Sequence, residues 1–134
     1  CIEQGIKEGA SIALGGGTDA ARLAGAYVTP TLFTNVTPGM TVGRDEIFGP
    51  VAALFKFNSE AEAIALANDS IYGLAASVWP SDVKRAHRMV KALEAGVIWV
   101  NCFGDGDMTQ PFGGYKQSGN TRDKSMECLA GYMQ

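Results

Sequence analysis

Three apolar, strand-like runs alternate with two helical segments between residues 51 and 100, and this alternation narrows the choice of fold more than anything else in the sequence. The strand-like runs cover residues 51–57, 74–79 and 97–100. The last run is apolar throughout, as in a strand buried on both faces. Strands that are joined by crossover helices within one sheet run parallel, with right-handed connections. The pattern therefore predicts an α/β fold with a parallel β-α-β-α-β sheet.

Each of the two helices carries a start signal and an apolar stripe. Ser59 precedes the first helix and forms a capping box with Glu62 three residues later. Ser81 is the predicted cap of the second helix, with Asp82 near the positive end of the helix dipole. Gly96 is predicted to end this helix. The expected buried positions are Ala63, Ile64 and Ala67 in the first helix and Val83, Ala86, Val90 and Leu93 in the second.

Shorter elements flank this region. Residues 1–8 are predicted to form the end of a helix that Gly9 terminates, and residues 11–14 form a short strand before a glycine turn. Pro30 limits the extended stretch 27–36 to a sheet edge or an irregular segment. Residues 101–122 lack periodicity and form a long loop, and residues 123–133 return to a helical pattern. We expect a single partial domain over residues 1–134, cut at both ends.

Composition and charge exclude several classes of function. The chain is 46% hydrophobic and 19% charged, so it can form a packed core rather than a disordered segment. Its net charge is −3, and its densest basic group is best explained as a solvated helix face, so no nucleic-acid partner is expected. No apolar run approaches the ~20 residues that span a bilayer, so no membrane partner is expected either. The basic group comprises Lys84, Arg85, Arg88 and Lys91.

The cysteines predict neither a metal site nor a disulfide framework. Cys1, Cys102 and Cys128 are widely spaced, and only one histidine, His87, accompanies them. Zinc sites need four closely arranged ligands, so no metal is expected. The odd, scattered set indicates a reduced compartment, and we expect a cytoplasmic protein. None of the three has a neighbouring base in the sequence, so no catalytic residue is predicted.

The segment 45–50 contains the first candidate site. Glu46 could accept hydrogen bonds from two neighbouring hydroxyls, such as those of a ribose, and Phe48 could pack against a flat ring. Ligands bind near strand ends in α/β sheets, and this segment directly precedes a strand. The residues alone favour a plainer interpretation, in which Glu46 pairs with Arg44 and Phe48 belongs to the core.

The segment 101–119 contains the second candidate site. Phe103 and Phe112 could line an apolar channel, and Gly113 with Gly114 allows a tight turn. Lys116 could be a catalytic amine, but a solvated loop lysine is the more common case. The glycines at 15–17 lack the spacing of a phosphate-binding loop and are predicted to form a plain turn.

An ordered set of motifs in these segments resembles the aldehyde dehydrogenase superfamily. Residues 46–50 match its E-[IV]-F-G-P motif, and residues 111–119 match P-F-G-G-x-K-x-S-G. Between them, residues 63–68, 72–75 and 96–101 match A-I-x-x-A-N, Y-G-L-A and G-x-[VI]-W-[VI]-N. Upstream, the glycines at 15–17 and residues 30–32 match the family's G-G and P-T-[LV] stretches. The resemblance covers nearly the whole chain in the correct order.

The resemblance implies roles for both candidate sites. By analogy with the family, Glu46 bonds the nicotinamide ribose of NAD or NADP, Phe48 packs near the nicotinamide, and the loop 101–110 lines the substrate tunnel. This favours the functional interpretation of Glu46 and Phe48 over the plainer one. The expected substrate-binding residues in and after that loop include Cys102, Phe103 and Phe112. Position 121 is Thr where close relatives usually have Gly, so that turn is expected to differ.

In the family, a cysteine thiolate attacks the aldehyde, a hydride passes to NAD(P)+, and water hydrolyses the thioester to a carboxylic acid. The family's nucleophile motif G-Q-x-C and base motif E-L-G-G do not occur in this sequence. The resemblance therefore implies the C-terminal half of a catalytic domain, without the cofactor-binding domain and inactive by itself. The intact enzyme is expected to be a homo-oligomer, and the fragment is expected to self-associate. A truncated, non-enzymatic assembly module is the alternative.

A narrower resemblance concerns the substrate. Residues 105–108, followed by the P-F-G-G segment, resemble bacterial aminoaldehyde dehydrogenases of the γ-glutamyl-γ-aminobutyraldehyde type. Asp105 and Asp107 would then attract a cationic substrate end. Ordinary solvated loop aspartates are the alternative.

Overall fold

The computed structural model describes residues 1–16 and 27–133 of the chain, arranged as two compact units. The first unit comprises Cys1–Asn58 and the second comprises Ser59–Gln134. The expectation of a single partial domain over residues 1–134 stays a prediction. The third glycine of the 15–17 turn lies outside the described residues.

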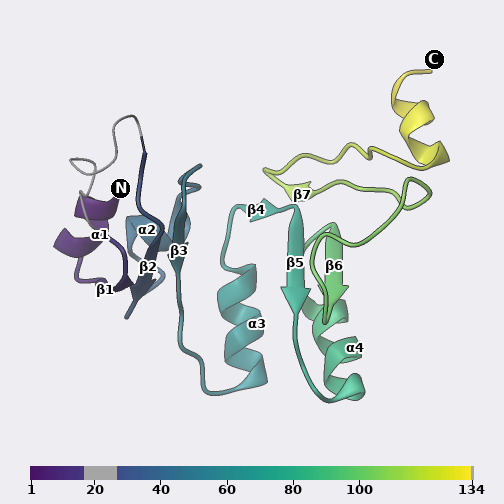
Figure 1. Cartoon of the computed structure of the whole chain (residues 1–134). Coiled ribbons are helices and arrows are strands. Elements are labelled where there is room, and N and C mark those ends of the chain that lie inside the picture. The colour runs from purple at the N-terminus through teal and green to yellow at the C-terminus, as the bar shows by residue number, and fades with distance from the viewer. Residues whose placement is uncertain (17–26, 134) are drawn as a thin grey trace. The chain divides into compact units, whose positions relative to one another are not determined.

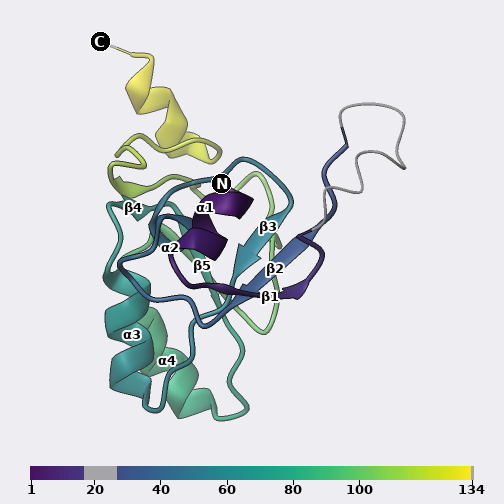
Figure 2. The ribbon, with the colours of Figure 1, turned by 90° about the vertical axis from the view of Figure 1, so that its left-hand side faces the viewer.

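The first unit is a small mixed sheet with two short helices (Figures 1 and 2). Its elements are α1 (Ile2–Lys7), β1 (Ser11–Leu14), β2 (Thr31–Thr34), α2 (Thr41–Arg44) and β3 (Val51–Ala53). The strand order is β1-β2-β3, with β1 antiparallel and β3 parallel to the central strand β2. Helix α1 ends before Gly9, which has a φ of 99°, so the predicted glycine stop is confirmed.

Phe33 of β2 is the centre of this unit's core. Its side chain is 0% exposed and clusters with Ala10, Val36 and Val42. Gly5 lets α1 approach this cluster, because a Cβ there would lie 2.7 Å from a methyl group of Val42. The alternating burial of β2 follows from the two-residue period of a strand, which sends Thr31 and Phe33 to one face.

The second unit contains two separate two-stranded ladders and a pair of helices. Its elements are α3 (Glu60–Asn68), β4 (Tyr72–Gly73), β5 (Ala75–Val78), α4 (Val83–Ala92), β6 (Val97–Val100), β7 (Tyr115–Lys116) and the 3₁₀ helix η2 (Met126–Gly131). Strands β5 and β6 are parallel, with Ser77 opposite Trp99, and β4 is antiparallel to β7.

Helices α3 and α4 lie side by side in Figures 1 and 2. Hydrogen bonds and ion pairs join them near the N-terminal and C-terminal ends of the pair. Near their N-terminal ends, Glu60 accepts hydrogen bonds from Arg85 at 3.1 Å and from Arg88 at 2.8 Å. At the other ends, the Asn68 amide donates to the Ala92 carbonyl at 2.8 Å and accepts from the Glu94 N–H at 2.9 Å. The helices therefore run in the same direction.

The predicted N-terminal cap of α3 is confirmed, whereas the predicted N-terminal cap of α4 is wrong by one residue. Ser59 caps α3 by accepting a hydrogen bond from the Glu62 N–H at 3.1 Å. The cap of α4 is Asp82 rather than Ser81, because the Asp82 carboxylate accepts from the Lys84 N–H at 2.8 Å. Helix α4 ends at Ala92, four residues before Gly96. Of its predicted stripe, Ala86 is buried, Val90 and Leu93 are half-buried, and Val83 is 67% exposed.

The α/β class and the parallel pairing of β5 with β6 are confirmed, and three details differ. Strand β3 pairs with β2 instead of β5 among the described residues. Strand β2 is central rather than an edge, because Pro30 lies just before the ladder and removes no donor from it. Among the described residues 123–133, helix is confined to Met126–Gly131 and has the tighter 3₁₀ form.

Candidate functional site

The first candidate site is the loop between α2 and β3. Glu46 is exposed in this loop, and the Phe48 side chain is 90% exposed, so Phe48 is not a core residue in this structure. Phe48 also has a φ of 52°, a left-handed conformation that is strained for a bulky side chain. Such strain concentrates at functional positions, where it holds a side chain in a required place.

The plainer interpretation of Glu46 finds no support among the described residues. No described basic residue forms an ion pair with Glu46, Arg44 included. Arg44 instead acts electrostatically on Glu8. Hydrogen bonds from Gln4 and Thr41, with a smaller contribution from Arg44, hold the pKa of Glu8 below its ordinary value. The Glu46 carboxylate is therefore left accessible to a ligand.

The second candidate site is a hollow beneath the loop that follows β6, entirely within the second unit. Its volume is about 360 Å³. Three of the residues predicted to bind substrate line it, and Trp99, Gly106 and Gln110 complete the lining. Those three predicted residues are Cys102, Asp105 and Asp107. The sequence reasoning missed Trp99, although its position on the strand leading into the loop, two residues after Val97, places both on one face.

The two aspartates are held by local hydrogen bonds. Asp107 Oδ1 accepts from the Thr109 hydroxyl at 2.5 Å and from the Thr109 N–H at 2.7 Å. These bonds lower the pKa of Asp107, the hydroxyl contributing most, and partial burial opposes them. Asp105 Oδ1 accepts from the Gly106 N–H at 2.9 Å. In each case the described bonds use only one carboxylate oxygen.

The two predicted aromatics flank this loop differently. Phe103 is 77% exposed, and its ring packs against Trp99 with centroids 5.1 Å apart. Phe112 is half-buried and lines an adjoining hollow of about 180 Å³. The Lys124 ammonium lies 5.5 Å from the Phe112 ring centre. Phe112 also exchanges main-chain hydrogen bonds with Asp123 at 2.7 and 2.8 Å.

Residues of the motif 111–119 make contacts that stabilise the fold. Lys116 Nζ donates to the carbonyls of Asn68 and Ser70 at 2.9 and 3.1 Å and lies 2.7 Å from the Glu94 carboxylate. Lys116 is therefore not a solvated loop lysine without partners. Its ammonium binds structural acceptors and is not arranged as a catalytic amine. Gly96 is required by close approach, because a Cβ there would lie 1.7 Å from the Gly113 carbonyl.

The two candidate sites belong to different units. Glu46 and Phe48 lie in the first unit, and Cys102, Phe103, Asp105, Asp107 and Phe112 lie in the second. No group of three potential metal ligands occurs among the described residues. Cys1 is exposed, and Cys128 contacts the Ser125 carbonyl at 3.1 Å.

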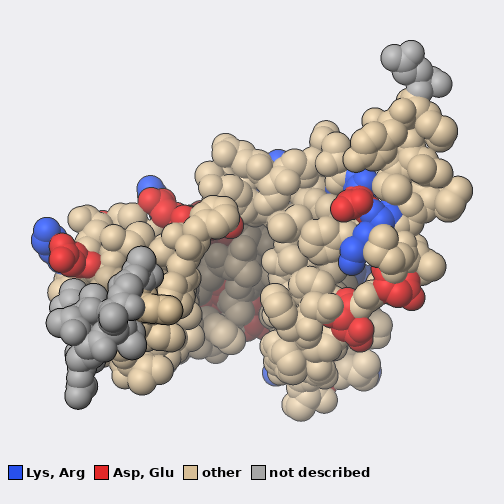
Figure 3. Space-filling view, turned by 45° about the horizontal axis from the view of Figure 1, so that its top comes forward, with Lys and Arg blue, Asp and Glu red and all other residues tan. Residues whose placement is uncertain are grey.

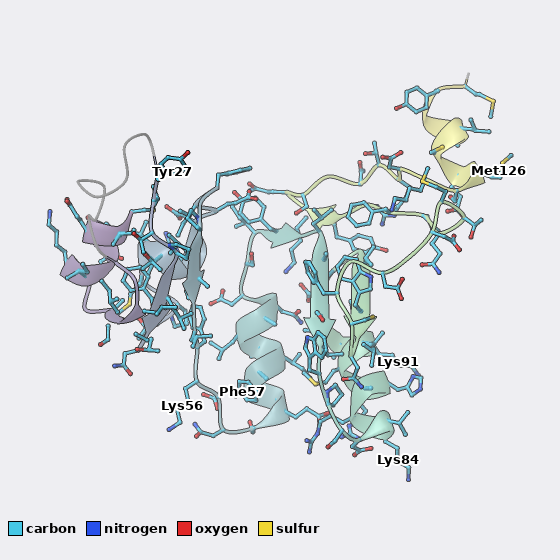
Figure 4. The ribbon with its side chains drawn as sticks, viewed as in Figure 1. Tyr27, Lys56, Phe57, Lys84, Lys91 and Met126 are labelled. Carbon is cyan, nitrogen blue, oxygen red and sulfur yellow. The ribbon has the colours of Figure 1, made fainter. Side chains whose placement is uncertain are left out.

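The basic group on α4 is a solvated helix face that is partly neutralised. Arg85 and Arg88 bind Glu60, whereas Lys84 and Lys91 extend away from the helix in Figure 4. On the face shown in Figure 3, the largest group of basic side chains lies near the C-terminal end of the chain, next to acidic ones. Among the residues that the structure covers, no helix combines the length and apolarity needed to cross a membrane.

Comparisons with known proteins agree with the motif pattern. The family model of the aldehyde dehydrogenase family matches residues 1–134. The NADP/NAD-dependent aldehyde dehydrogenase PuuC of Escherichia coli is 57% identical over 104 residues, covering 78% of this chain and 21% of that protein. The betaine aldehyde dehydrogenase of Brucella anthropi is 45% identical over 135 residues, covering 99% of this chain and 28% of that protein.

A solved structure shares the fold as well. The crystal structure of an indole-3-acetaldehyde dehydrogenase in complex with NAD+ superposes with a TM-score of 0.94 at 46% identity, covering 99% of this chain and 27% of that one. The chain thus spans about a quarter of the length of the relatives it matches. Because the family model matches every residue, the chain belongs to the aldehyde dehydrogenase family.

Proposed function

We propose that this chain is part of an NAD(P)-dependent aldehyde dehydrogenase that oxidises an aldehyde to a carboxylic acid. The observation that carries the proposal is the loop before β3, where an exposed carboxylate and an exposed aromatic stand two residues apart. Phe48 is 90% exposed despite its apolar ring, and Glu46 has no ion-pair partner among the described residues. A strained, exposed aromatic beside a free carboxylate suits a ligand with a sugar and a flat ring.

The residues present fit a nicotinamide cofactor. In the proposal, the Glu46 carboxylate accepts hydrogen bonds from the two hydroxyls of the nicotinamide ribose, since an ionised carboxylate is an acceptor with two oxygens. The Phe48 ring packs beside the nicotinamide. The bound cofactor supplies an acceptor for the hydride that leaves the aldehyde carbon. The contribution of this segment is therefore positioning, on which the rate of hydride transfer depends strongly.

We propose further that the hollow beneath the loop after β6 belongs to the aldehyde site, and that the preferred aldehydes are cationic. Asp105 and Asp107 line this hollow, and the bonds from Thr109 that lower the pKa of Asp107 favour its ionised form. Two negative charges beside the aromatic Trp99 favour an ammonium group. One relative carries the name betaine aldehyde dehydrogenase, and betaine aldehyde has a quaternary ammonium. The narrower resemblance at residues 105–108 points to aminoaldehydes in the same charge class.

The test uses the intact enzyme that carries this segment, with the double variant Asp105→Asn/Asp107→Asn. The ratio of kcat/KM for an aminoaldehyde to that for a neutral aldehyde of equal length is the measured quantity. We expect this ratio to fall about tenfold, because charge-assisted contacts are each worth roughly 1.5–3 kcal/mol when fully formed and less when solvated. The control Glu3→Gln/Glu62→Gln removes two charges from helices and leaves the ratio unchanged.

The outcomes separate the two parts of the proposal. An unchanged ratio in the Asp105/Asp107 double variant would refute the cationic substrate class while leaving the dehydrogenase assignment intact. Absence of NAD(P)H formation by the intact wild-type protein, with aldehydes of every charge class and both cofactors, would refute the assignment itself. The homo-oligomeric state and the cytoplasmic location stay predictions.

A further inference from the structure

One face of the β5–β6 pair carries two side-chain donors that hold the loop above the hollow. The Ser77 hydroxyl donates to the Cys102 carbonyl at 2.7 Å, and the Trp99 indole N–H donates to the Asp105 carbonyl at 2.5 Å. Ser77 and Trp99 are paired residues in the parallel ladder. Paired residues on neighbouring strands point to the same face, so the two donors stand side by side.

Besides these two bonds, the loop is held by the Asp107–Thr109 turn and by a hydrogen bond from the Ser125 N–H to the Met108 carbonyl at 2.7 Å, so the segment 102–106 depends most on the two donors. It contains Gly104 and Gly106, with φ values of 73° and 137°, and no helix or strand is formed between residues 101 and 112. Flexible segments of this kind lose considerable conformational entropy when they are ordered. The two donors bind main-chain oxygens, so the side chains of Cys102 and Asp105 remain available to line the hollow. The ring of Trp99 also packs against Phe103, which gives the loop an apolar support.

We propose that Trp99 and Ser77 are positioning residues for the aldehyde site, and that they set aldehyde affinity by fixing the carbonyls of Asp105 and Cys102. This inference rests on the proposed function of the hollow. Neither residue needs to touch the aldehyde for this role. Loss of either hydrogen bond lets the loop sample other conformations, and the population that is competent to bind the aldehyde decreases.

The experiment compares Trp99→Phe, Ser77→Ala and Ser77→Thr in the intact enzyme that carries this segment. Phe keeps an aromatic ring against Phe103 but loses the N–H donor together with one ring of the indole, so Ser77→Ala, which removes only a hydroxyl, is the cleaner variant of the two. Thr keeps the hydroxyl and suits a strand, so it is the rescue variant for Ala. Trp79→Phe is the matched control, because Trp79 is 67% exposed and has no described hydrogen bond.

Two readouts are taken on each variant. The first is steady-state kinetics, in which we expect Trp99→Phe and Ser77→Ala to raise the aldehyde KM by about three- to tenfold, the effect of losing one neutral hydrogen bond. The KM for NAD(P)+ is expected to stay the same, and kcat to change by less than about twofold. The second is hydrogen–deuterium exchange, in which uptake by peptides covering residues 102–110 rises while uptake over α4 does not.

Faster exchange in the loop together with a selective rise in aldehyde KM, reversed in Ser77→Thr, supports the inference. Unchanged exchange at residues 102–110 overturns it. Faster exchange with an unchanged aldehyde KM also overturns it, because the loop would then not be coupled to the aldehyde. An equal rise in both KM values would indicate general structural damage and would likewise count against it. Failure of the proposed function appears separately, as a wild-type enzyme without dehydrogenase activity.

Discussion

At the scale of single residues, Phe48 combines two features that folding alone does not favour. Its side chain is 90% exposed, so it contributes little to a core, and its φ of 52° is strained for a residue with a Cβ. A left-handed conformation of a non-glycine residue costs about 1–2 kcal/mol. A position that keeps both features is explained more simply by ligand binding than by stability.

Replacing Phe48 with Gly separates these two explanations. Glycine adopts positive φ without strain, so we expect Phe48→Gly to leave the melting temperature of the intact enzyme unchanged or slightly raised. We expect the KM for NAD(P)+ to rise about tenfold in the same variant, because the ring proposed to pack near the nicotinamide is lost. Phe48→Tyr keeps the ring and is the control. A fall of several degrees in melting temperature with an unchanged cofactor KM would assign Phe48 to packing instead.

The residues of both candidate sites could be named from the sequence because motifs identify positions. The contacts that these and neighbouring residues make in the folded chain could not be predicted in the same way. Lys116 appears in the sequence as a loop lysine, yet it binds two main-chain carbonyls and Glu94, which are 22 or more positions away along the chain. The role of Trp99 was missed for the same reason: a motif marks its position, but its hydrogen-bond partner is a carbonyl in an irregular loop.

At the scale of elements, the helix pair α3–α4 depends on a charge cluster at one end. Glu60 accepts hydrogen bonds from both Arg85 and Arg88. The bonds from Arg88 contribute most to lowering the pKa of Glu60 below its ordinary value, and partial burial opposes them. A group whose pKa is lowered in the folded state stabilises the fold above its ordinary pKa, and this contribution is lost as the pH falls through the lowered value.

We therefore expect the stability of this helix pair to fall on acidification below about pH 4.5, the ordinary glutamate value. Melting temperatures of the wild-type protein and of Glu60→Gln should differ at pH 7 and converge toward pH 3. Glu3→Gln, which changes an exposed glutamate on α1, is the control and should follow the wild type. A constant difference between wild type and Glu60→Gln across this pH range would contradict the assignment.

The locations of the elements and the parallel pairing of β5 with β6 were predictable, but the pairing of β3 was not. Periodicity and capping patterns depend on neighbouring residues, so the locations of α3, α4, β5 and β6 followed from the sequence. Strand β3 spans only three residues, and its partners are Thr31 to Phe33 of β2. That choice is determined by the Phe33 core, to which Val51 and Ala53 contribute, and not by anything within the strand.

At the scale of the whole molecule, the exposed apolar surface of the second unit is the basis for expecting association. Among the described residues, the buried hydrophobic side chains of the second unit are only Val78 and Ala86. Large apolar side chains next to its strands and on η2 are exposed, including Leu74, Trp79 and Met126, the last of which points outward in Figure 4. Extended exposed apolar surface marks sites of association.

We therefore expect the 134-residue chain, produced alone, to self-associate and to lack dehydrogenase activity. Light scattering should give a mass well above the 14.1 kDa of one chain, rising with concentration. No NAD(P)H should form with any aldehyde, because neither nucleophile motif nor base motif is present in its sequence and no described thiol lies beside a base. A stable monomer would show that the exposed apolar surface is tolerated in water. Turnover by the purified chain, abolished by alkylating its cysteines, would instead assign catalysis to Cys1, Cys102 or Cys128.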